Sequence, residues 1–201
     1  MTTADYQRLL VNKKEKVMEE LKNEIKFSYE DYRNLPESET NIYELIDGEF
    51  VMVPSPITYH QEISRNIEYF LWDFVRKNKM GFVYLAPLDV IFSKENVVQP
   101  DILYISKERS EIITENNIQG APDLIIEILS KSTAKRDKTL KKTLYAKYGV
   151  KEYWIVDPKT KTVEVLILQK TGYNRDRIYK KNETLTSSLL GDLKIDLKEV
   201  F

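Results

Sequence analysis

The 201-residue chain contains no cysteine, and this absence excludes disulfides, thiolate-bound zinc, iron–sulfur clusters and thiol catalysis. It also has no apolar run near the ~18 residues that a membrane span requires. Its first residues lack the apolar segment of a signal peptide. These absences predict a cytoplasmic protein that does not contact a membrane.

An excess of positive charge is missing as well. The chain has 31 Lys and Arg against 32 Asp and Glu, which gives a formal net charge of −1 at pH 7. This balance removes the simplest argument for nucleic-acid binding, but a net value says nothing about local clusters of basic residues. Binding to nucleic acid is therefore less favoured but not excluded.

The composition that is present, 42% hydrophobic and 31% charged residues, is that of a soluble globular protein. The length suffices for one domain with a sizeable core. Residues 5–26 predict a helix with a thin apolar face, so we expect an appended helix over 1–26 and a single domain over 27–201. Ser28 and Asp31 have the spacing of a capping box and predict a short second helix that ends before Pro36.

The rest of the chain alternates between strand and helix patterns. Asp47-Gly48 joins two β-prone runs and predicts a hairpin with a type I′ turn. Apolar residues at helical spacing predict helices over 57–78 and 136–148, the second ending at Gly149. Strands are expected over 82–92, 98–105, 123–129, 151–158, 162–169 and 172–181, with a polar segment at 106–121. This order predicts a mixed α/β domain.

Two acidic residues lie in strands that otherwise have the composition of buried strands. Asp101 is at the start of "PDILYIS", and Glu127 is in the middle of "PDLIIEILS". An ionised carboxylate taken out of water is costly unless something pairs with it. Since side chains alternate along a strand, Glu127 shares a face with Ile125, and Asp101 shares one with Leu103. If the strands are neighbours, both acids point into one cleft.

Such a pair of acids predicts a metal site. Two unpaired carboxylates ~4 Å apart repel by roughly 4 kcal/mol at an effective dielectric near 20, and a divalent cation removes that penalty. Hard oxygen ligands that leave room for water and phosphate oxygens suit Mg²⁺, for which Mn²⁺ can substitute. The alternative for Asp101 is a strand-end acid that caps backbone groups after Pro100.

A lysine that could serve this site comes from the helix over 136–148. Four residues define its expected buried side: Leu140, Leu144, Tyr145 and Tyr148. Lys141 and Asp137 fall on the same side. Lys138 lies at its edge, and Lys135, Lys142 and Lys147 point outward. Lys141 could instead form an inward salt bridge without catalysis, and Asp137 could be a first-turn acid favoured by the helix dipole.

These stretches, in this order, resemble a bacterial "putative restriction endonuclease" family (Uma-type, a domain of unknown function) of the PD-(D/E)XK nuclease superfamily. The matching pieces are "QPD", "PDLIIEILS", the lysine-bearing helix and "GVKEYWIVDP". The resemblance extends upstream through "YELIDGEFVMVPSP" and His60-Gln61, and downstream through Gly172-Tyr173 to Phe201. It covers roughly residues 28–201.

The resemblance implies a restriction-endonuclease-like core, a central mixed β-sheet flanked by helices, here with an extra N-terminal hairpin and an appended N-terminal helix. It also implies that Asp101, Glu127 and the carbonyl of Ile128 hold Mg²⁺. The lysine of the E-x-K half-motif would stand at position 129, which is Leu. Relocation of this lysine onto the next helix is a variation of the superfamily, so Lys141 is the expected catalytic lysine. Lys135 and Lys138 belong to the charged run 135–142, which could contact DNA phosphates near the cleft, although such a run is most simply a solvated face.

Two further residues are candidates for supporting the site. His60 lies on the inner side of its helix where the family has a histidine, although a lone histidine there is commonly a hydrogen-bonded core residue. Many relatives of this fold bind metal with an acid from the first helix. Glu62 points outward on that helix, so Glu49, on the hairpin, is the expected replacement.

Three classes of function remain open at this point. The first is a Mg²⁺-dependent endonuclease that acts on DNA as a homodimer. The second is a catalytically weak or inactive nuclease fold that binds nucleic acid or a protein. The third is a structural or regulatory module that assembles through its N-terminal helix. Two acids aimed into one cleft favour the first, because only a metal-using protein needs both.

Overall fold

The computed structural model describes residues 26–36 and 42–201. The helix expected over 5–26 therefore lies outside the described residues, apart from its last position. The short helix α2 (Tyr29–Arg33) begins at the predicted capping box, in which Ser28 and Asp31 exchange hydrogen bonds. None of the helices in the described ranges is long and apolar enough to cross a membrane.

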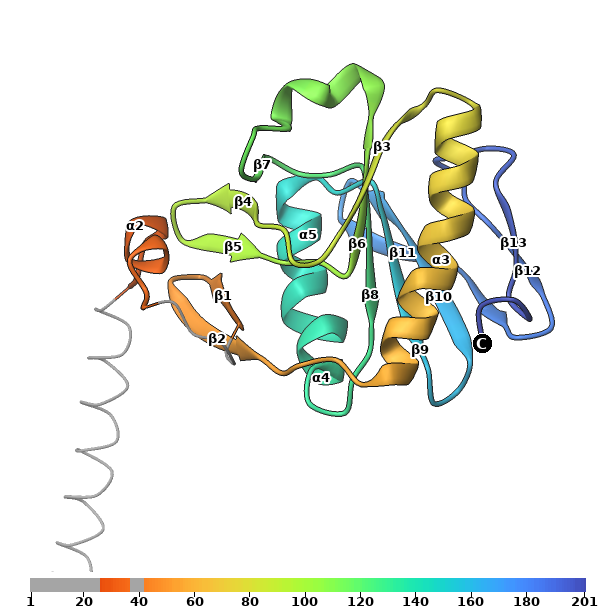
Figure 1. Ribbon diagram of the computed structural model, residues 1–201, viewed down its shortest axis with the longest axis horizontal. Coiled ribbons are helices and arrows are strands. Elements are labelled where there is room, and N and C mark those ends of the chain that lie inside the picture. The colour runs from red at the N-terminus through yellow and green to blue at the C-terminus, as the bar shows by residue number, and fades with distance from the viewer. Residues whose placement is uncertain (1–25, 37–41) are drawn as a thin grey trace, which may run out of the picture.

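A six-stranded mixed sheet forms the centre of the molecule, with the strand order β11-β10-β9-β8-β6-β3 (Figure 1). Its strands, in chain order, are β3 (Gly81–Leu85), β6 (Ile102–Ser106), β8 (Leu124–Ile128), β9 (Glu152–Asp157), β10 (Thr162–Gln169) and β11 (Gly172–Lys180). The neighbours β8 and β9 are parallel, and the other pairs are antiparallel. A central mixed sheet, as expected, therefore organises the fold.

A second, five-stranded sheet has the order β2-β1-β5-β4-β7. Its strands are β1 (Ile42–Ile46), β2 (Glu49–Val53), β4 (Val90–Ser93), β5 (Asn96–Val98) and β7 (Ile118–Gln119). Asp47 and Gly48, which join β1 to β2, both have positive φ, 50° and 79°, as a type I′ turn requires. The expected N-terminal hairpin is therefore confirmed, and it belongs to the five-stranded sheet rather than to the central sheet.

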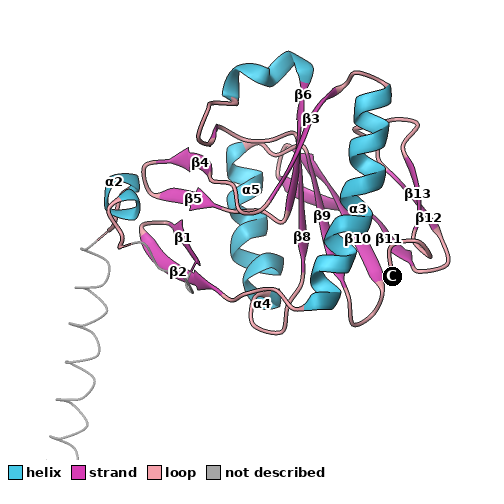
Figure 2. Cartoon of the chain, in the orientation of Figure 1, coloured by secondary structure: helices cyan, strands magenta, loops and turns pink. Residues whose placement is uncertain are grey.

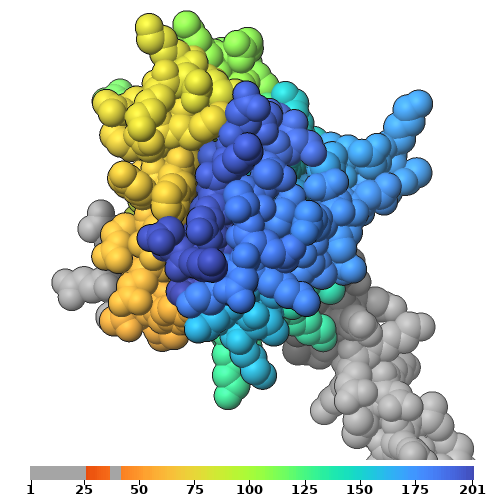
Figure 3. Space-filling model, turned by 90° about the vertical axis from the view of Figure 1, so that its right-hand side faces the viewer, coloured from red at the N-terminus to blue at the C-terminus, as the bar shows by residue number. Residues whose placement is uncertain are grey.

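Helix α3 (Thr58–Lys77) covers one face of the central sheet (Figure 2). Its buried stripe consists of Ile63, Ile67, Leu71 and Val75. This stripe packs in one cluster with Leu124, Ile126 and Ile128 of β8, the strand face that alternation assigns to the main core. The hairpin of β12 (Thr184–Thr186) and β13 (Lys194–Asp196) completes this layer, and the C-terminal segment lies beside α3 (Figure 3).

The opposite face of the sheet is covered by a helix in three parts: α4 (Ala134–Arg136), a π turn (Asp137–Lys141) and α5 (Lys142–Tyr148). Leu144 and Tyr145 pack against Ile125 of β8 and Tyr153 of β9. Gly149 follows in the left-handed region, with φ 87°, so the predicted helix end is confirmed. The five-stranded sheet adjoins this layer through Ile46, Val90 and Val98.

The structure corrects two strands that the sequence predicted as continuous. The run 82–92 divides into β3 and β4, which belong to different sheets, and the break contains Pro87. The run 98–105 likewise divides between β5, which ends at Val98, and β6, with a break at residues 99–101. There Pro100 has no N–H for a ladder, and the N–H of Gln99 donates to the Glu44 side chain at 3.0 Å. The polar segment 106–121 contains a 3₁₀ helix (Lys107–Ile112) and β7.

The helix over 136–148 departs from its predicted phase. The π turn inserts an extra residue into the helical repeat, so positions before and after it no longer follow one spacing of 100°. Leu140, expected on the buried side, is 39% exposed, and that prediction is wrong. Asp137 and Lys141 are both buried as expected.

Candidate active site

Asp101 and Glu127 lie opposite each other on neighbouring strands. In the antiparallel register of β6 and β8, Leu103 pairs with Ile125 and Ile102 with Ile126, so the next pair is Asp101 with Glu127. Asp101 Oδ2 accepts a hydrogen bond from the N–H of Ile128 at 2.7 Å. The structure thus places Asp101 against the backbone of β8 beside Glu127, whose side chain faces α5.

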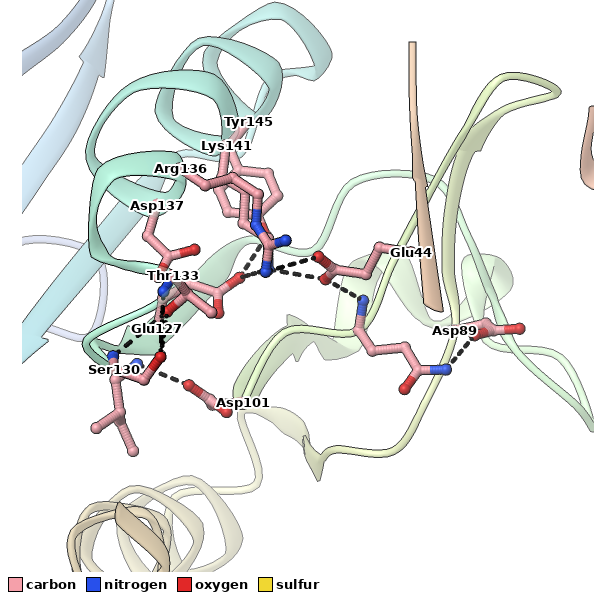
Figure 4. A network of polar contacts seen from close by, with 12 residues as sticks. Glu44, Asp89, Asp101, Glu127, Ser130, Thr133, Arg136, Asp137, Lys141 and Tyr145 are labelled. Carbon is pink, nitrogen blue, oxygen red and sulfur yellow. Dashed lines mark hydrogen bonds and ion pairs between the residues drawn. The ribbon is translucent and has the colours of Figure 1, made fainter. Parts of the chain in front are cut away.

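Lys141 reaches Glu127 from the helix. Its Nζ lies 2.9 Å from Glu127 Oε1, and the Tyr145 hydroxyl donates to the same oxygen at 2.5 Å. Lys141 Nζ also lies 2.7 Å from Glu44 Oε1. The relocated lysine is therefore held between two carboxylates from different sheets (Figure 4).

Glu44, on β1, was not among the residues that the sequence singled out. It is 0% exposed, accepts from Gln99 N–H at 3.0 Å and lies 3.6 Å from Arg136 Nη2 through its other oxygen. The sequence does contain a signal for Glu44, because this acid interrupts the apolar run "IYELI" just as Glu127 interrupts its strand. The expected hairpin acid, Glu49, is exposed at the start of β2 and does not join this cluster.

The π turn presents two more charged side chains. Asp137 is 2% exposed, its Oδ1 is buried without a hydrogen-bond partner, and burial raises its pKa against the opposing effect of the Lys141 charge. Arg136, which precedes it, points toward Glu44 (Figure 4). Lys135 is exposed, and Lys138 is half-exposed and 3.8 Å from Asp157 Oδ2, so both lie at the rim rather than among the acids.

His60, on α3, contacts the same two strands from the other layer. Its Nε2 lies 3.0 Å from the carbonyl oxygen of Ile128 and 3.3 Å from Asp101 Oδ2. Burial alone would lower its pKa, but the hydrogen bond and charge of Asp101 outweigh burial and raise it. A histidine with these contacts fixes the positions of Asp101 and of the Ile128 carbonyl.

Burial determines the protonation of the central pair. It raises the pKa of Glu127 to about 8, despite the opposing charge of Lys141. Burial would lower the pKa of Lys141, but the carboxylates of Glu127 and Glu44 outweigh it and raise that pKa. Lys141 is therefore charged at neutral pH, and burial favours the protonated form of Glu127 up to about pH 8 unless further positive charge lowers that pKa.

The donor set suits a divalent cation. The contacts above use Oδ2 of Asp101 and Oε1 of Glu127, so the second oxygen of each carboxylate is available to a ligand. When ionised, Glu44, Asp101, Glu127 and Asp137 carry two more charges than Lys141 and Arg136 neutralise. No three acidic or histidine side chains of the described ranges converge as a complete metal site. An ion bound here would therefore need a main-chain carbonyl, water or substrate oxygens as its other ligands, as is common for Mg²⁺.

Comparison with known proteins finds a family model and solved structures that are similar to this chain. The family model described as "Uma2: Putative restriction endonuclease" matches residues 29–198. Among solved structures, a "putative nuclease belonging to DUF820" from Anabaena variabilis superposes with a TM-score of 0.73 at 23% sequence identity, covering 87% of this chain and 97% of that chain. No curated protein matches the chain. The structural likeness, at this identity, is a likeness of fold.

Proposed function

The chain belongs to the Uma2 family of "putative restriction endonucleases" and has a restriction-endonuclease-like fold, and from this premise we propose that it is a Mg²⁺-dependent endonuclease acting on DNA. The observation that supports the proposal is that Asp101 contacts the backbone of Ile128, next to Glu127, and that Lys141 reaches Glu127 from the helix. Two acids can hold a metal that activates water, and a lysine beside them can stabilise the charge that develops during phosphodiester hydrolysis.

Asp101, Glu127 and the carbonyl of Ile128 would hold the cation, with Mn²⁺ as a substitute for Mg²⁺. The buried oxygens of Glu44 and Asp137 that lack a hydrogen-bond partner support this assignment, because acceptors without a donor are available to a cation. When bound, Mg²⁺ polarises a phosphate and lowers the pKa of a coordinated water.

Lys141 supplies a fixed positive charge beside Glu127. The carboxylates of Glu127 and Glu44 hold its ammonium at 2.9 and 2.7 Å, so the charge needs no rearrangement during the reaction. In this position the ammonium orients the attacking water or stabilises the negative charge that develops on the phosphate. His60 holds Asp101 and the Ile128 carbonyl in place through Nε2.

The rim of the site offers contacts for the DNA backbone. Lys135 and Lys138 are accessible on the same helix that carries Lys141, and lysines of this kind bind phosphates without reading sequence. Enzymes that cut both strands of a duplex commonly pair two sites, so we expect a homodimer. We place this activity in the cytoplasm.

A second candidate function is a nuclease fold that binds nucleic acid without cutting it. One observation favours it: the Ile128 carbonyl, which would be a metal ligand, already contacts His60 Nε2 at 3.0 Å. In that case the two acids would have a structural role: Asp101 accepts a hydrogen bond from the Ile128 N–H, and Glu127 pairs with Lys141.

Cleavage of supercoiled plasmid separates the two candidates. We expect the full chain to nick or linearise plasmid in Mg²⁺ or Mn²⁺, and chelation or the substitution Asp101→Asn to abolish this cleavage. An exposed acid of β11, Asp176, provides the matched control, and Asp176→Asn should cut like the wild type. Plasmid binding without cleavage in either metal would support the second candidate instead.

A further inference from the structure

Arg136 carries a charge into a buried position without the hydrogen bonds that such a charge needs. Its side chain is 14% exposed, and its Nε and Nη2 are both buried without a hydrogen-bond partner. Buried polar groups of folded proteins are nearly always hydrogen-bonded, and buried charges are almost always paired. The protein's own atoms therefore do not supply the acceptor that these two nitrogens require.

Glu44 is the acid nearest to Arg136, but it does not fill this role. Its Oε2 lies 3.6 Å from Arg136 Nη2, beyond hydrogen-bond length, and this oxygen is itself buried without a partner. The other oxygen of Glu44 is already bound by Lys141 and by Gln99 N–H. Arg136 and Glu44 therefore form an ion pair without a direct hydrogen bond between them.

The π turn explains why Arg136 faces the acids. In an α-helix, residues five apart are separated by about 140° around the axis, so Arg136 and Lys141 would point to different sides. The hydrogen bonds of a π turn join residues five apart and bring the two side chains nearer to one side. Such single π turns occur frequently at functional sites. Arg136 and Lys141 thus both reach toward Glu44 (Figure 4).

The two free nitrogens also identify the ligand. Nε and Nη2 lie along one edge of the guanidinium and donate in parallel, which matches two oxygens of a phosphate. We propose that Arg136 turns its guanidinium from Glu44 toward the substrate and binds a phosphate of the DNA backbone beside Glu127 and Lys141, which leaves Glu44 to the metal or to water. The inference rests on the proposed function for its assignment of a phosphodiester to this site.

The proposal is tested by comparing Arg136→Gln with Lys142→Gln, since each removes one positive charge from the same helix and Lys142 makes no contact with the acids. The measurement is the affinity for a short DNA duplex in Ca²⁺, by fluorescence anisotropy. We expect Arg136→Gln to weaken binding at least ~10-fold and Lys142→Gln no more than ~3-fold. Calorimetry should show an unchanged or higher affinity for Mn²⁺ in Arg136→Gln, because a charge that repels the cation is gone.

Equal weakening by the two substitutions would overturn the proposal. If Arg136→Gln does not fold, Arg136→Lys replaces it, because this variant keeps the charge but lacks the paired donors. Arg136→Lys should bind the duplex several-fold more weakly than the wild type. Equal binding by Arg136→Lys and the wild type would also overturn the proposal. Binding of inorganic phosphate tests the role of Arg136 independently of whether the protein cleaves DNA. We expect phosphate to raise the melting temperature of the wild type but not of Arg136→Gln, even in a protein that cuts no DNA, and no effect on the wild type would count against Arg136.

Discussion

Lys141 Nζ and Glu127 Oε1 lie 2.9 Å apart in a buried ion pair that joins the helix to the central sheet. In the E-x-K pattern the lysine would come from position 129, on the same strand as the acid, but Leu129 occupies that position and is buried in the core. The helix therefore supplies the charge that the strand lacks. Glu44 shares this lysine from a third segment of the chain.

Replacing Lys141 should abolish cleavage while the metal still binds. In Lys141→Ala, the carboxylates of Glu44 and Glu127 lose their common cation, and breaking a buried pair costs about 3–5 kcal/mol of stability. Plasmid cleavage in Mn²⁺, measured well below the lowered melting temperature, should fall below detection. The affinity for Mn²⁺ should change only modestly.

Lys142→Ala is the matched control for Lys141→Ala, because the neighbouring side chain points outward, and it should cut nearly as well as the wild type. If cleavage survives Lys141→Ala but is lost in Lys138→Ala or Lys131→Ala, the catalytic lysine has been assigned to the wrong residue.

Glu127→Gln should stabilise the metal-free protein. Burial raises the pKa of Glu127 from 4.5 in the unfolded chain to about 8, so ionisation of this carboxyl opposes folding. The protonated carboxyl makes its full contribution to stability below about pH 4.5, and this contribution is lost as the pH rises toward 8. The amide oxygen of glutamine can still accept from Lys141 and Tyr145. We expect Glu127→Gln to melt a few degrees higher than the wild type at pH 8 in a chelator, and equally near pH 4.5. A lower melting temperature at pH 8 would contradict this.

Asp123→Asn should destabilise the fold with the opposite pH dependence. Burial would raise the pKa of Asp123, but hydrogen bonds from Lys151, Ser106 N–H and Arg109 together lower it. A lowered pKa stabilises the folded state above pH 3.8, the unfolded value, and this stability is lost as the pH falls through the folded pKa. At pH 7, we expect a loss of about 2 kcal/mol in urea unfolding, shrinking below pH 4. A loss that is constant with pH would refute the charge as its cause.

Light scattering of the full chain at micromolar concentration should give the mass of a homodimer. The reason is geometric, since one site of this kind cuts one strand and a symmetric pair of sites cuts both. A mass of one chain, 23.7 kDa, would instead predict an enzyme that nicks duplexes, and plasmid products would then be open circles.

The sequence predicted the parts of the site that depend on local spacing. Alternation along a strand placed Glu127 on the face opposite Ile126 and Ile128, and helical phase placed Lys141 and Asp137 inward. The hairpin turn and the capping box were equally local, because each depends on two or three neighbouring residues.

The parts that the sequence missed depend on contacts between distant segments or on irregular backbone. Glu44 joins the site because β1 pairs with β5, which precedes Asp101 in the chain. Local sequence patterns do not predict that pairing. The π turn shifts the helical phase, which turned Leu140 outward and brought Arg136 toward Glu44. Glu49 shares a hairpin face with Glu44, because it pairs with Ile46 across the turn. It stands at the exposed start of β2, however, and does not reach the buried cluster.

The central claim, that Asp101 and Glu127 form a divalent-metal site, is tested most directly by calorimetric titration of the full chain with Mn²⁺ and Mg²⁺. Glu127→Ala and Asp101→Asn are titrated beside the wild type and the surface control Asp176→Asn. We predict saturable binding by the wild type and the control, and its loss in both site variants. Binding that is equal in all four proteins, or absent from the wild type, would contradict the account.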